Sequence, residues 1–246
     1  MKIDILTLFP EMFDALNHSI LKRAQNNNLI DISVHNIRDF SLDKNKRCDD
    51  YSYGGGAGMI MTPQPIFDAI KSVKTKKSYV VYFSPKGKIL TQKKVESLAN
   101  CEKDLVLLCG HYEGIDERVI SLCVDEEISI GDYVLTGGEI PAMVLVDAVA
   151  RYIPNVLGNE NATQMESFSQ NLLEYPQYTR PFEFEGESVP QVLLDGNHKE
   201  VDKWRQEKMV EITKKRRPDL FRKWKKEQEN SKKENSKQEK NKNDKK

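Results

Sequence analysis

The fold is decided by residues 79–130, which read YVVYFSPKGKILTQKKVESLANCEKDLVLLCGHYEGIDERVISLCVDEEISI. Short apolar runs at 79–83, 104–109 and 124–130 predict strands, and the segments 92–99 and 115–122 between them have helical character. Strands that alternate with helices in this way are typical of a parallel sheet. We therefore expect an α/β domain with a parallel sheet.

Polar turns that contain glycine follow the strands of this region. They span Ser84–Lys88, Gly110–Gly114 and Gly131–Gly138. Any one of them is explained as a plain tight turn. Ligands of parallel sheets, however, bind just beyond the carboxyl ends of the strands, so three such turns together predict a pocket lined by backbone. The apolar walls of this pocket would come from Tyr82, Phe83, Tyr112, Tyr133 and Leu135.

Residues 131–154 add a glycine turn, an apolar helix and one arginine to this pattern. Glycine at 131, 137 and 138 lets the backbone approach a ligand closely, because no Cβ intervenes. Arg151 follows at the polar end of the helix. Helical spacing relates the residues that we expect in the core, Ile140, Met143, Val144, Val146, Val149 and Ala150.

Upstream, the chain begins with a predicted strand over Lys2–Leu8 and a helix that Pro10 opens at its first position. A second strand is predicted over Ile30–Ile37. Residues 41–63 are polar and rich in glycine, and they are too many for a simple connector, which indicates a functional loop.

Downstream, the pattern changes at about residue 158. We expect a linker over 158–165, a small, mainly helical domain over 166–225 with an amphipathic helix at 197–213, and a disordered basic tail over 226–246. Residues 214–226, KKRRPDLFRKWKK, interleave cations with aromatic residues. A solvated helix end explains this run, but the interleaving and the mildly acidic body of the chain favour contacts with nucleic acid phosphates.

Composition excludes several classes of protein. The 246 residues are 38% hydrophobic and contain no apolar stretch of membrane length, and Asp4 and Glu11 interrupt any export signal, so we expect a cytoplasmic protein without a membrane partner. The four cysteines have no C-x-x-C spacing, which favours reduced thiols. Neither G-x-G-x-x-G nor a P-loop is present, and the four histidines lie far apart, so we predict no metal site and no hydrolytic triad.

Eight ordered segments resemble the bacterial tRNA (guanine-N1)-methyltransferases, the TrmD family of the SPOUT superfamily. The resemblance runs from Met1 to about Trp224. Its segments are LTLFPEMF (6–13), DDYSYGGGAGM (49–59), YFSPKG (82–87), CGHYEGIDERV (109–119), IGDYVLTGGEIPAM (130–143), VARYIPNVLG (149–158), YPQYTRP (175–181), and KWR with RRPDL (203–205, 216–220).

The resemblance implies transfer of a methyl group from S-adenosyl-L-methionine to N1 of guanosine 37 of tRNA, next to the anticodon. It also implies a SPOUT-type parallel sheet with a C-terminal trefoil knot over residues 1–157, an obligate homodimer with shared active sites, and magnesium dependence. The residues implied in cofactor binding are Tyr82, Phe83, Ser84, Pro85, Gly87, Gly110, Tyr112, Glu113, Ile130, Gly131, Asp132, Tyr133, Val134, Leu135, Gly137 and Gly138.

Two catalytic residues are implied by the resemblance. Guanine N1 is protonated and a poor nucleophile, so a carboxylate that removes the proton and a cation that stabilises charge on O6 both lower the barrier. Arg151 matches the family's cation, and Glu166 stands where the family has its catalytic aspartate. Ser52 and His111 are milder departures, where proline and arginine are usual. Residues implied in tRNA binding are Asp49, Lys214, Lys215, Arg216 and Arg217.

Two alternatives to this enzyme stay open at the level of sequence. The glutamate at 166 and the basic tail suit a non-catalytic RNA-binding protein that has kept the fold. A related methyltransferase that acts on ribosomal RNA or on a ribose hydroxyl is the other, and YPQYTRP and RRPDL argue against it.

Overall fold

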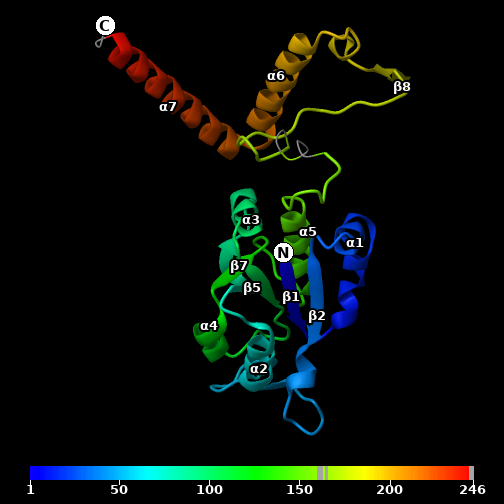
Figure 1. Ribbon diagram of the computed structural model, residues 1–246, viewed down its shortest axis with the longest axis vertical. Coiled ribbons are helices and arrows are strands. Elements are labelled where there is room, and N and C mark those ends of the chain that lie inside the picture. Colours follow the sequence, from blue (N-terminus) through cyan, green and yellow to red (C-terminus); the bar gives the residue numbers. More distant parts are fainter. Residues whose placement is uncertain (160–162, 164–165, 244–246) are drawn as a thin grey trace. The chain divides into compact units, whose positions relative to one another are not determined.

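The computed structural model describes residues 1–159, 163 and 166–243 (Figure 1). The chain divides into two compact units, Met1–Glu160 and Asn161–Lys246. Most of the linker predicted over 158–165 lies outside the described residues, as do the last three residues of the predicted tail.

The N-terminal unit is built on a five-stranded sheet, as the alternation of strands and helices predicts. The strand order is β2-β1-β6-β5-β7, and each neighbouring pair is parallel. Figure 1 shows this sheet at the centre of the unit with helices around it. The strands are β1 (Lys2–Thr7), β2 (Asp31–Asn36), β5 (Ser78–Ile89), β6 (Asp104–Leu108) and β7 (Glu126–Ser129).

Both faces of the sheet are buried, which explains why its central strands read as continuous apolar runs. Alternate residues of β6 belong to two separate core clusters: Leu105 and Leu107 to one, Val106 and Leu108 to the other. The first cluster contains apolar residues of α1 (Ser19–Asn26), α3 (Gln92–Ala99) and α5 (Glu139–Ala150), and the second those of α2 (Pro63–Val73) and α4 (Glu117–Cys123).

Two predicted segments are organised differently in the structure. The segment opened by Pro10 starts as a 3-10 helix, η1 (Pro10–Asn17), and breaks at His18, whose backbone is extended, before α1 begins. Residues 84–88 are not a free turn after the strand, because β5 continues to Ile89 and resumes its pairing with β7 after a register shift between Phe83 and Lys88. The pairing of Lys88 and Ile89 with β7 holds residues 84–88 in an extended conformation.

The glycine-rich segment 41–63 forms a small hairpin. After the 3-10 turn η2 (Ile37–Phe40), β3 (Asp49–Tyr51) and β4 (Met59–Met61) pair in antiparallel fashion, and α2 follows.

The C-terminal unit is mainly helical, with α6 (His198–Arg216), α7 (Pro218–Asn243), the short strands β8 (Glu183–Phe184) and β9 (Glu187–Ser188), and η3 (Gln191–Leu193). Thr213, which is fully buried, links α6 to the segment before it, because its hydroxyl accepts a hydrogen bond from the Leu173 backbone N–H at 2.7 Å. Leu172 and Met209 are buried as well.

Residues 226–243 of the tail that the sequence predicts to be disordered belong to α7. The prediction rested on low hydrophobicity. These residues, however, include neither glycine nor proline and are rich in lysine, glutamate and glutamine, which have high intrinsic helix propensity.

Candidate active site

A cavity of about 310 Å3 lies at the carboxyl edge of the sheet, where the three predicted turns meet. The turns come from β5, from the loop after β6 and from the loop between β7 and α5. Every residue assigned to cofactor binding from the sequence lines this cavity except Gly87 and Asp132. Lining residues that were not assigned to cofactor binding from the sequence include Lys86, His111, Glu117, Glu127 and Thr136.

Gly87 does not line the cavity because it packs against the backbone of β7. A Cβ at this position would lie 2.5 Å from the Glu127 carbonyl carbon and 2.6 Å from the Ile128 nitrogen. Only glycine allows two backbone segments to cross at this distance. Gly87 therefore supports the wall of the cavity without lining it. Asp132, the other assigned residue that does not line the cavity, is exposed to solvent.

Gly138 joins the third loop to the second. Its N–H donates to the Gly110 carbonyl oxygen at 2.8 Å, and a Cβ there would lie 2.8 Å from the Cys109 Cα. The loop before α5 is consequently pressed against the end of β6.

A buried carboxylate anchors the same loop to β1. Glu139, the first residue of α5, is 2% exposed, and its Oε1 accepts a hydrogen bond from the Thr7 hydroxyl at 2.8 Å. The Thr7 hydroxyl oxygen in turn accepts one from the Phe9 N–H at 2.9 Å. Glu139 was not among the residues predicted from the sequence, although an acidic residue at the start of an apolar helix is a signal for a favourable interaction with the helix N-terminus.

Tyr82 forms a wall of the cavity beneath the second loop. A Cβ on Gly110 would lie 2.9 Å from the Tyr82 ring, so the loop backbone rests on it. Burial raises the pKa of Tyr82 to about 12, and the Glu127 carboxylate adds to the rise. The phenol therefore stays neutral at physiological pH.

Two buried polar atoms at the cavity have no hydrogen-bond partner among the described residues. They are Oε2 of Glu127 and Nδ1 of His111. His111 packs between Phe9 and Tyr112, with ring centroids 4.8 Å and 5.1 Å away. Buried polar groups are nearly always satisfied in native proteins, so these atoms favour a site that is completed by a ligand or by water.

The glycine-rich hairpin is bonded to the second loop of the cavity. The Glu113 N–H donates to the Met59 carbonyl oxygen at 3.0 Å, and the Met61 N–H donates to the Gly114 carbonyl oxygen at 3.0 Å. Asp49, the predicted substrate residue, begins β3 opposite Met61 and is half-buried.

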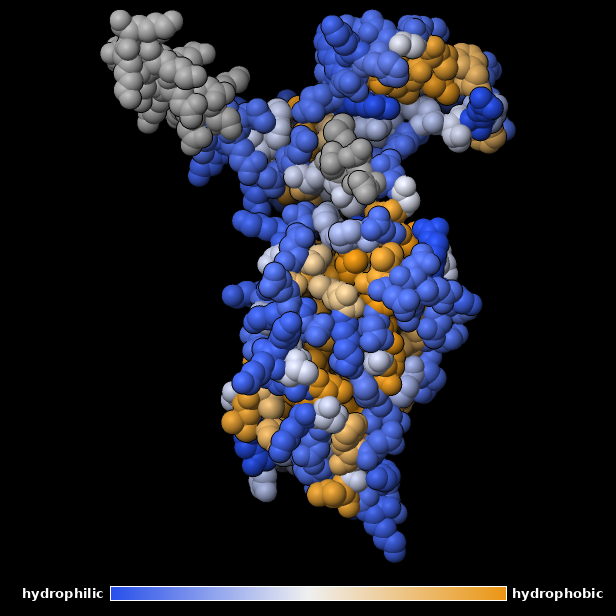
Figure 2. Space-filling model, in the orientation of Figure 1, coloured by the Kyte–Doolittle hydropathy of each residue, from blue (hydrophilic) through white to orange (hydrophobic). Residues whose placement is uncertain are grey.

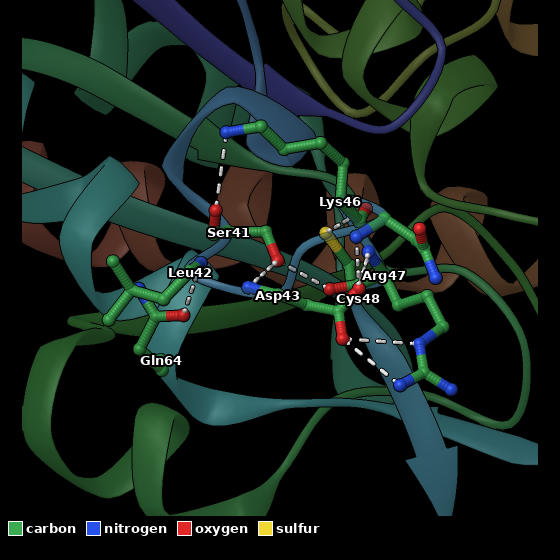
Figure 3. A network of polar contacts seen from close by, with 8 residues as sticks. Ser41, Leu42, Asp43, Lys46, Arg47, Cys48 and Gln64 are labelled. Carbon is green, nitrogen blue, oxygen red and sulfur yellow. Dashed lines mark hydrogen bonds and ion pairs between the residues drawn. The ribbon is translucent and has the colours of Figure 1, made fainter.

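The loop that leads into this hairpin is held by its own polar contacts (Figure 3). The Asp43 carboxylate accepts hydrogen bonds from the backbone N–H of Asn45 at 2.7 Å and from the Arg47 guanidinium at 3.0 Å. Arg47 accordingly lowers the pKa of Asp43 to about 2. At the other side, the Ser41 hydroxyl donates to the Arg47 carbonyl oxygen at 2.6 Å, so the loop reaches Asp49 in a defined conformation.

The two predicted catalytic residues lie in different units. Arg151 follows the last turn of α5 in the N-terminal unit and is half-buried. Glu166 belongs to the C-terminal unit, where its carbonyl oxygen accepts hydrogen bonds from the N–H and the hydroxyl of Ser169. This turn fixes the backbone at Glu166.

The predicted basic residues occupy the junction of α6 and α7. Lys214, Lys215 and Arg216 end α6, and Arg217 stands between the helices with its guanidinium 2.7 Å from the Asp219 carboxylate. This ion pair lowers the pKa of Asp219 to about 2. All four cations are exposed.

No group of three His, Cys, Asp or Glu residues that could hold a metal ion occurs among the described residues. Within that same part of the chain, none of the helices has both the length and the apolar character to cross a membrane.

Comparison with known proteins relates most of the chain to one family. Residues 1–223 match the family described as tRNA (Guanine-1)-methyltransferase TrmD. A protein named tRNA (guanine-N(1)-)-methyltransferase from Clostridioides difficile is 54% identical over 91% of this chain and 98% of its own length. Proteins of the same name from Clostridium novyi and Clostridium perfringens are 56% and 54% identical, over 90% and 94% of this chain and 92% and 98% of their own lengths.

Proposed function

The chain belongs to the tRNA (guanine-1)-methyltransferase family, and from this premise we propose that it transfers a methyl group from S-adenosyl-L-methionine to N1 of guanosine 37 of tRNA. The observation that carries the proposal is the cavity at the carboxyl edge of the sheet. Its walls are the three loops that the family resemblance assigns to the cofactor.

The cavity suits this cofactor in size and chemistry. About 310 Å3 is within the range of small-molecule sites, and the walls combine backbone amides with aromatic and aliphatic side chains. Backbone N–H and C=O groups of the third loop would recognise the adenine edge, and Tyr133, Val134 and Leu135 would cover its faces. Bound there, S-adenosylmethionine supplies an electrophilic methyl group on its sulfonium.

The protein's own part in the reaction is to activate the guanine. We assign Glu166 as the general base that removes the N1 proton, and Arg151 as the cation that stabilises negative charge on O6. The positions of Gly138 and Glu139 keep the third loop in place while these groups act.

We infer that Arg151 and Glu166 meet across a homodimer, as the resemblance implies. Figure 2 provides support, because hydrophobic residues gather over the middle of the visible face of the N-terminal unit. Large apolar side chains that are more than 40% exposed occur on neighbouring elements of this unit, η1, α1 and α5. Exposed apolar surface of this kind is typical of a protein interface. The residues are Met12, Ile20, Ile140 and Val144, so the prediction that Ile140 and Val144 lie in the core is wrong.

We further infer that the C-terminal part of the sheet domain is knotted. This inference rests on the family to which the chain belongs. Magnesium dependence stays an expectation from the resemblance, and no step of the mechanism is assigned to the metal. The proposed tRNA substrate favours a location in the cytoplasm.

A methyl-transfer assay tests the proposed function. A tRNA transcript with guanosine at position 37 is expected to accept a methyl group, and the same transcript with adenosine there is expected to accept none. Absence of transfer at high enzyme concentration, with magnesium present, would contradict the proposal. Calorimetric binding of S-adenosylmethionine distinguishes the enzyme from a non-catalytic RNA-binding protein, and methyl mapping on total RNA reveals a ribosomal or ribose target.

Arg151→Ala tests the role of the cation. The variant is expected to raise the barrier of single-turnover transfer by about 3 kcal/mol, by analogy with the loss of one charge-stabilising donor. Arg151→Lys keeps the positive charge but lacks the planar guanidinium, so its single-turnover rate is expected to lie between those of the parent protein and Arg151→Ala. Single-turnover kinetics of Arg151→Ala equal to those of the parent protein would remove Arg151 from this role.

A further inference from the structure

The tip of the glycine-rich hairpin presents two aromatic rings to solvent. Tyr53 is fully exposed, with a relative accessibility of 102%, and Tyr51, the last residue of β3, is 80% exposed. The chain then turns back through Gly54 and Gly55, with φ of +85° and +78°, and a Cβ on either would meet no atom within 4 Å. Neither the fold nor the cavity therefore explains why these tyrosines are at the tip.

The tip is held in a fixed relation to the cavity. β4 is hydrogen-bonded to β3 on one side and to the second cavity loop on the other, through Met59 and Met61. Gly58 lies directly against the side chain of Glu113, since a Cβ there would be 2.6 Å from its Cγ. Because Glu113 lines the cavity, the hairpin that carries the tip adjoins the rim of the cavity.

A cation stands beside the tip. Arg118 is paired with Asp116 at 2.7 Å, and its side chain is 69% exposed. Asp116, its partner, donates its backbone N–H to the Met61 carbonyl oxygen of β4 at 3.1 Å, which places Arg118 beside the hairpin. The hydrogen bond to Asp116 raises the pKa of Arg118, and the Tyr53 phenol adds to the rise. An exposed ring with an arginine at its side is the usual composition of a platform for single-stranded nucleic acid.

We propose that Tyr53 is a stacking platform for an unpaired base of the tRNA, one that flanks the guanosine being methylated. This inference rests on the proposed function, because it takes the cavity as the place of methyl transfer. A base next to the target loses a stacking neighbour when the target enters the cavity, and an aromatic ring beside the cavity can replace that neighbour. Stacking is tolerant of sequence, so Tyr53 contributes affinity and position but no choice of base.

Tyr53→Ala tests the proposal through equilibrium binding of an anticodon stem-loop RNA, measured by fluorescence anisotropy in the presence of S-adenosylmethionine. We expect affinity to fall roughly 5- to 150-fold, the range for loss of one base-stacking aromatic residue. Tyr53→Phe keeps the ring and is expected to bind within about twofold of the parent. Leu42→Ala is the matched control, since Leu42 is also exposed, at 83%, on the preceding loop.

The salt dependence of binding separates stacking from phosphate contact. Loss of a ring releases no counterions, so Tyr53→Ala is expected to lower affinity by the same factor at all salt concentrations. An abasic nucleotide on one side of the target guanosine is expected to lower affinity about as much as Tyr53→Ala does. The two changes combined are expected to lower it no further.

Three results would overturn the proposal. The first is an RNA affinity of Tyr53→Ala within twofold of that of the parent protein. The second is that the losses from Tyr53→Ala and from the abasic nucleotide add at both flanking positions. The third is a changed oligomeric state of the variant in sedimentation, which would assign Tyr53 to a contact between copies of the chain. Methylation by the parent protein is measured in the same series. Failure of the parent to methylate contradicts the proposed function, whereas failure of the variant to weaken binding contradicts only the role of Tyr53.

Discussion

Glu166 carries the carboxylate that we assign as general base, and it is one methylene longer than the aspartate that the resemblance leads us to expect. The negative charge of the group is preserved, so the difference lies in the position of the carboxylate. The turn closed by Ser169 holds the backbone at Glu166, which leaves the side chain to absorb the extra length.

Substitutions at Glu166 separate charge from length. Glu166→Gln removes the base and is expected to lower single-turnover methyl transfer by roughly 10²- to 10⁴-fold. Glu166→Asp restores the usual family residue and is expected to stay within about tenfold of the parent. A rate for Glu166→Gln within twofold of the parent would exclude Glu166 as the base.

Tyr82 illustrates how burial at the cavity makes stability depend on pH. Its pKa is about 12 in the folded protein, against an ordinary value of about 10 for tyrosine. The folded state therefore holds the phenolic proton at pH values where the unfolded chain has lost it. The stabilising contribution is complete below pH 10 and is lost as pH rises from about 10 towards 12.

Tyr82→Phe is expected to remove this contribution. Between pH 9 and pH 11 the parent is expected to lose about 1 kcal/mol more unfolding free energy than the variant, as measured by urea denaturation without ligand. Equal losses in the two proteins would mean that the phenol is solvated in the folded state.

At the scale of elements, the cavity depends on how closely β5 crosses β7. The register shift between Phe83 and Lys88 lets residues 84–87 leave the ladder before Lys88 pairs with Ile128. Ser84, Pro85 and Lys86 line the cavity as a result. Gly87 is the point of closest approach. β5 thus contributes residues both to the hydrophobic core and to a wall of the cavity.

Gly87→Ala tests this crossing. The added methyl would lie 2.5 Å from backbone that cannot move aside, so we expect a loss of stability of about 1–3 kcal/mol, as for overpacked cores, together with weaker binding of S-adenosylmethionine. Thermal denaturation and calorimetry measure the two effects. Gly158→Ala is the control, because no atom lies within 4 Å of its Cβ position. Equal behaviour of the two variants would refute a tight crossing.

At the scale of the whole molecule, the chain separates a cavity in one unit from a basic junction in the other. Lys214 and Lys215 end α6 in the C-terminal unit, fully outside the core. Charges of this kind affect affinity for RNA through counterion release, with little dependence on base sequence.

Replacement of Lys214 and Lys215 by glutamine is expected to reduce the slope of log affinity against log salt by about 1–2 units for tRNA binding. Lys76 and Lys77 offer a matched control. They are also adjacent and exposed, but they lie just before β5, at the amino end of the sheet. Slopes that change equally in both double variants would indicate diffuse electrostatic attraction without a localised RNA contact at the junction.

The sequence by itself determined the family, the parallel sheet and the loops of the cavity. These depend on local patterns: apolar runs of strand length, helical spacing between them, and motifs such as YFSPKG and IGDYVLTGGEIPAM. A parallel sheet and its carboxyl edge follow from such patterns, because alternating strands and helices have few other ways to bury their apolar faces.

Only the tertiary structure decided which distant residues support that site. The bond between Thr7 and Glu139 joins residues 132 positions apart, the hairpin at 49–61 is bonded to residues 113–116, and Gly87 touches the backbone of Glu127. Each contact depends on the order of strands in the sheet and on burial from two sides, and local propensity contains neither. For the same reason, the sequence shows a tyrosine at position 53 but does not predict that its ring is exposed beside the cavity.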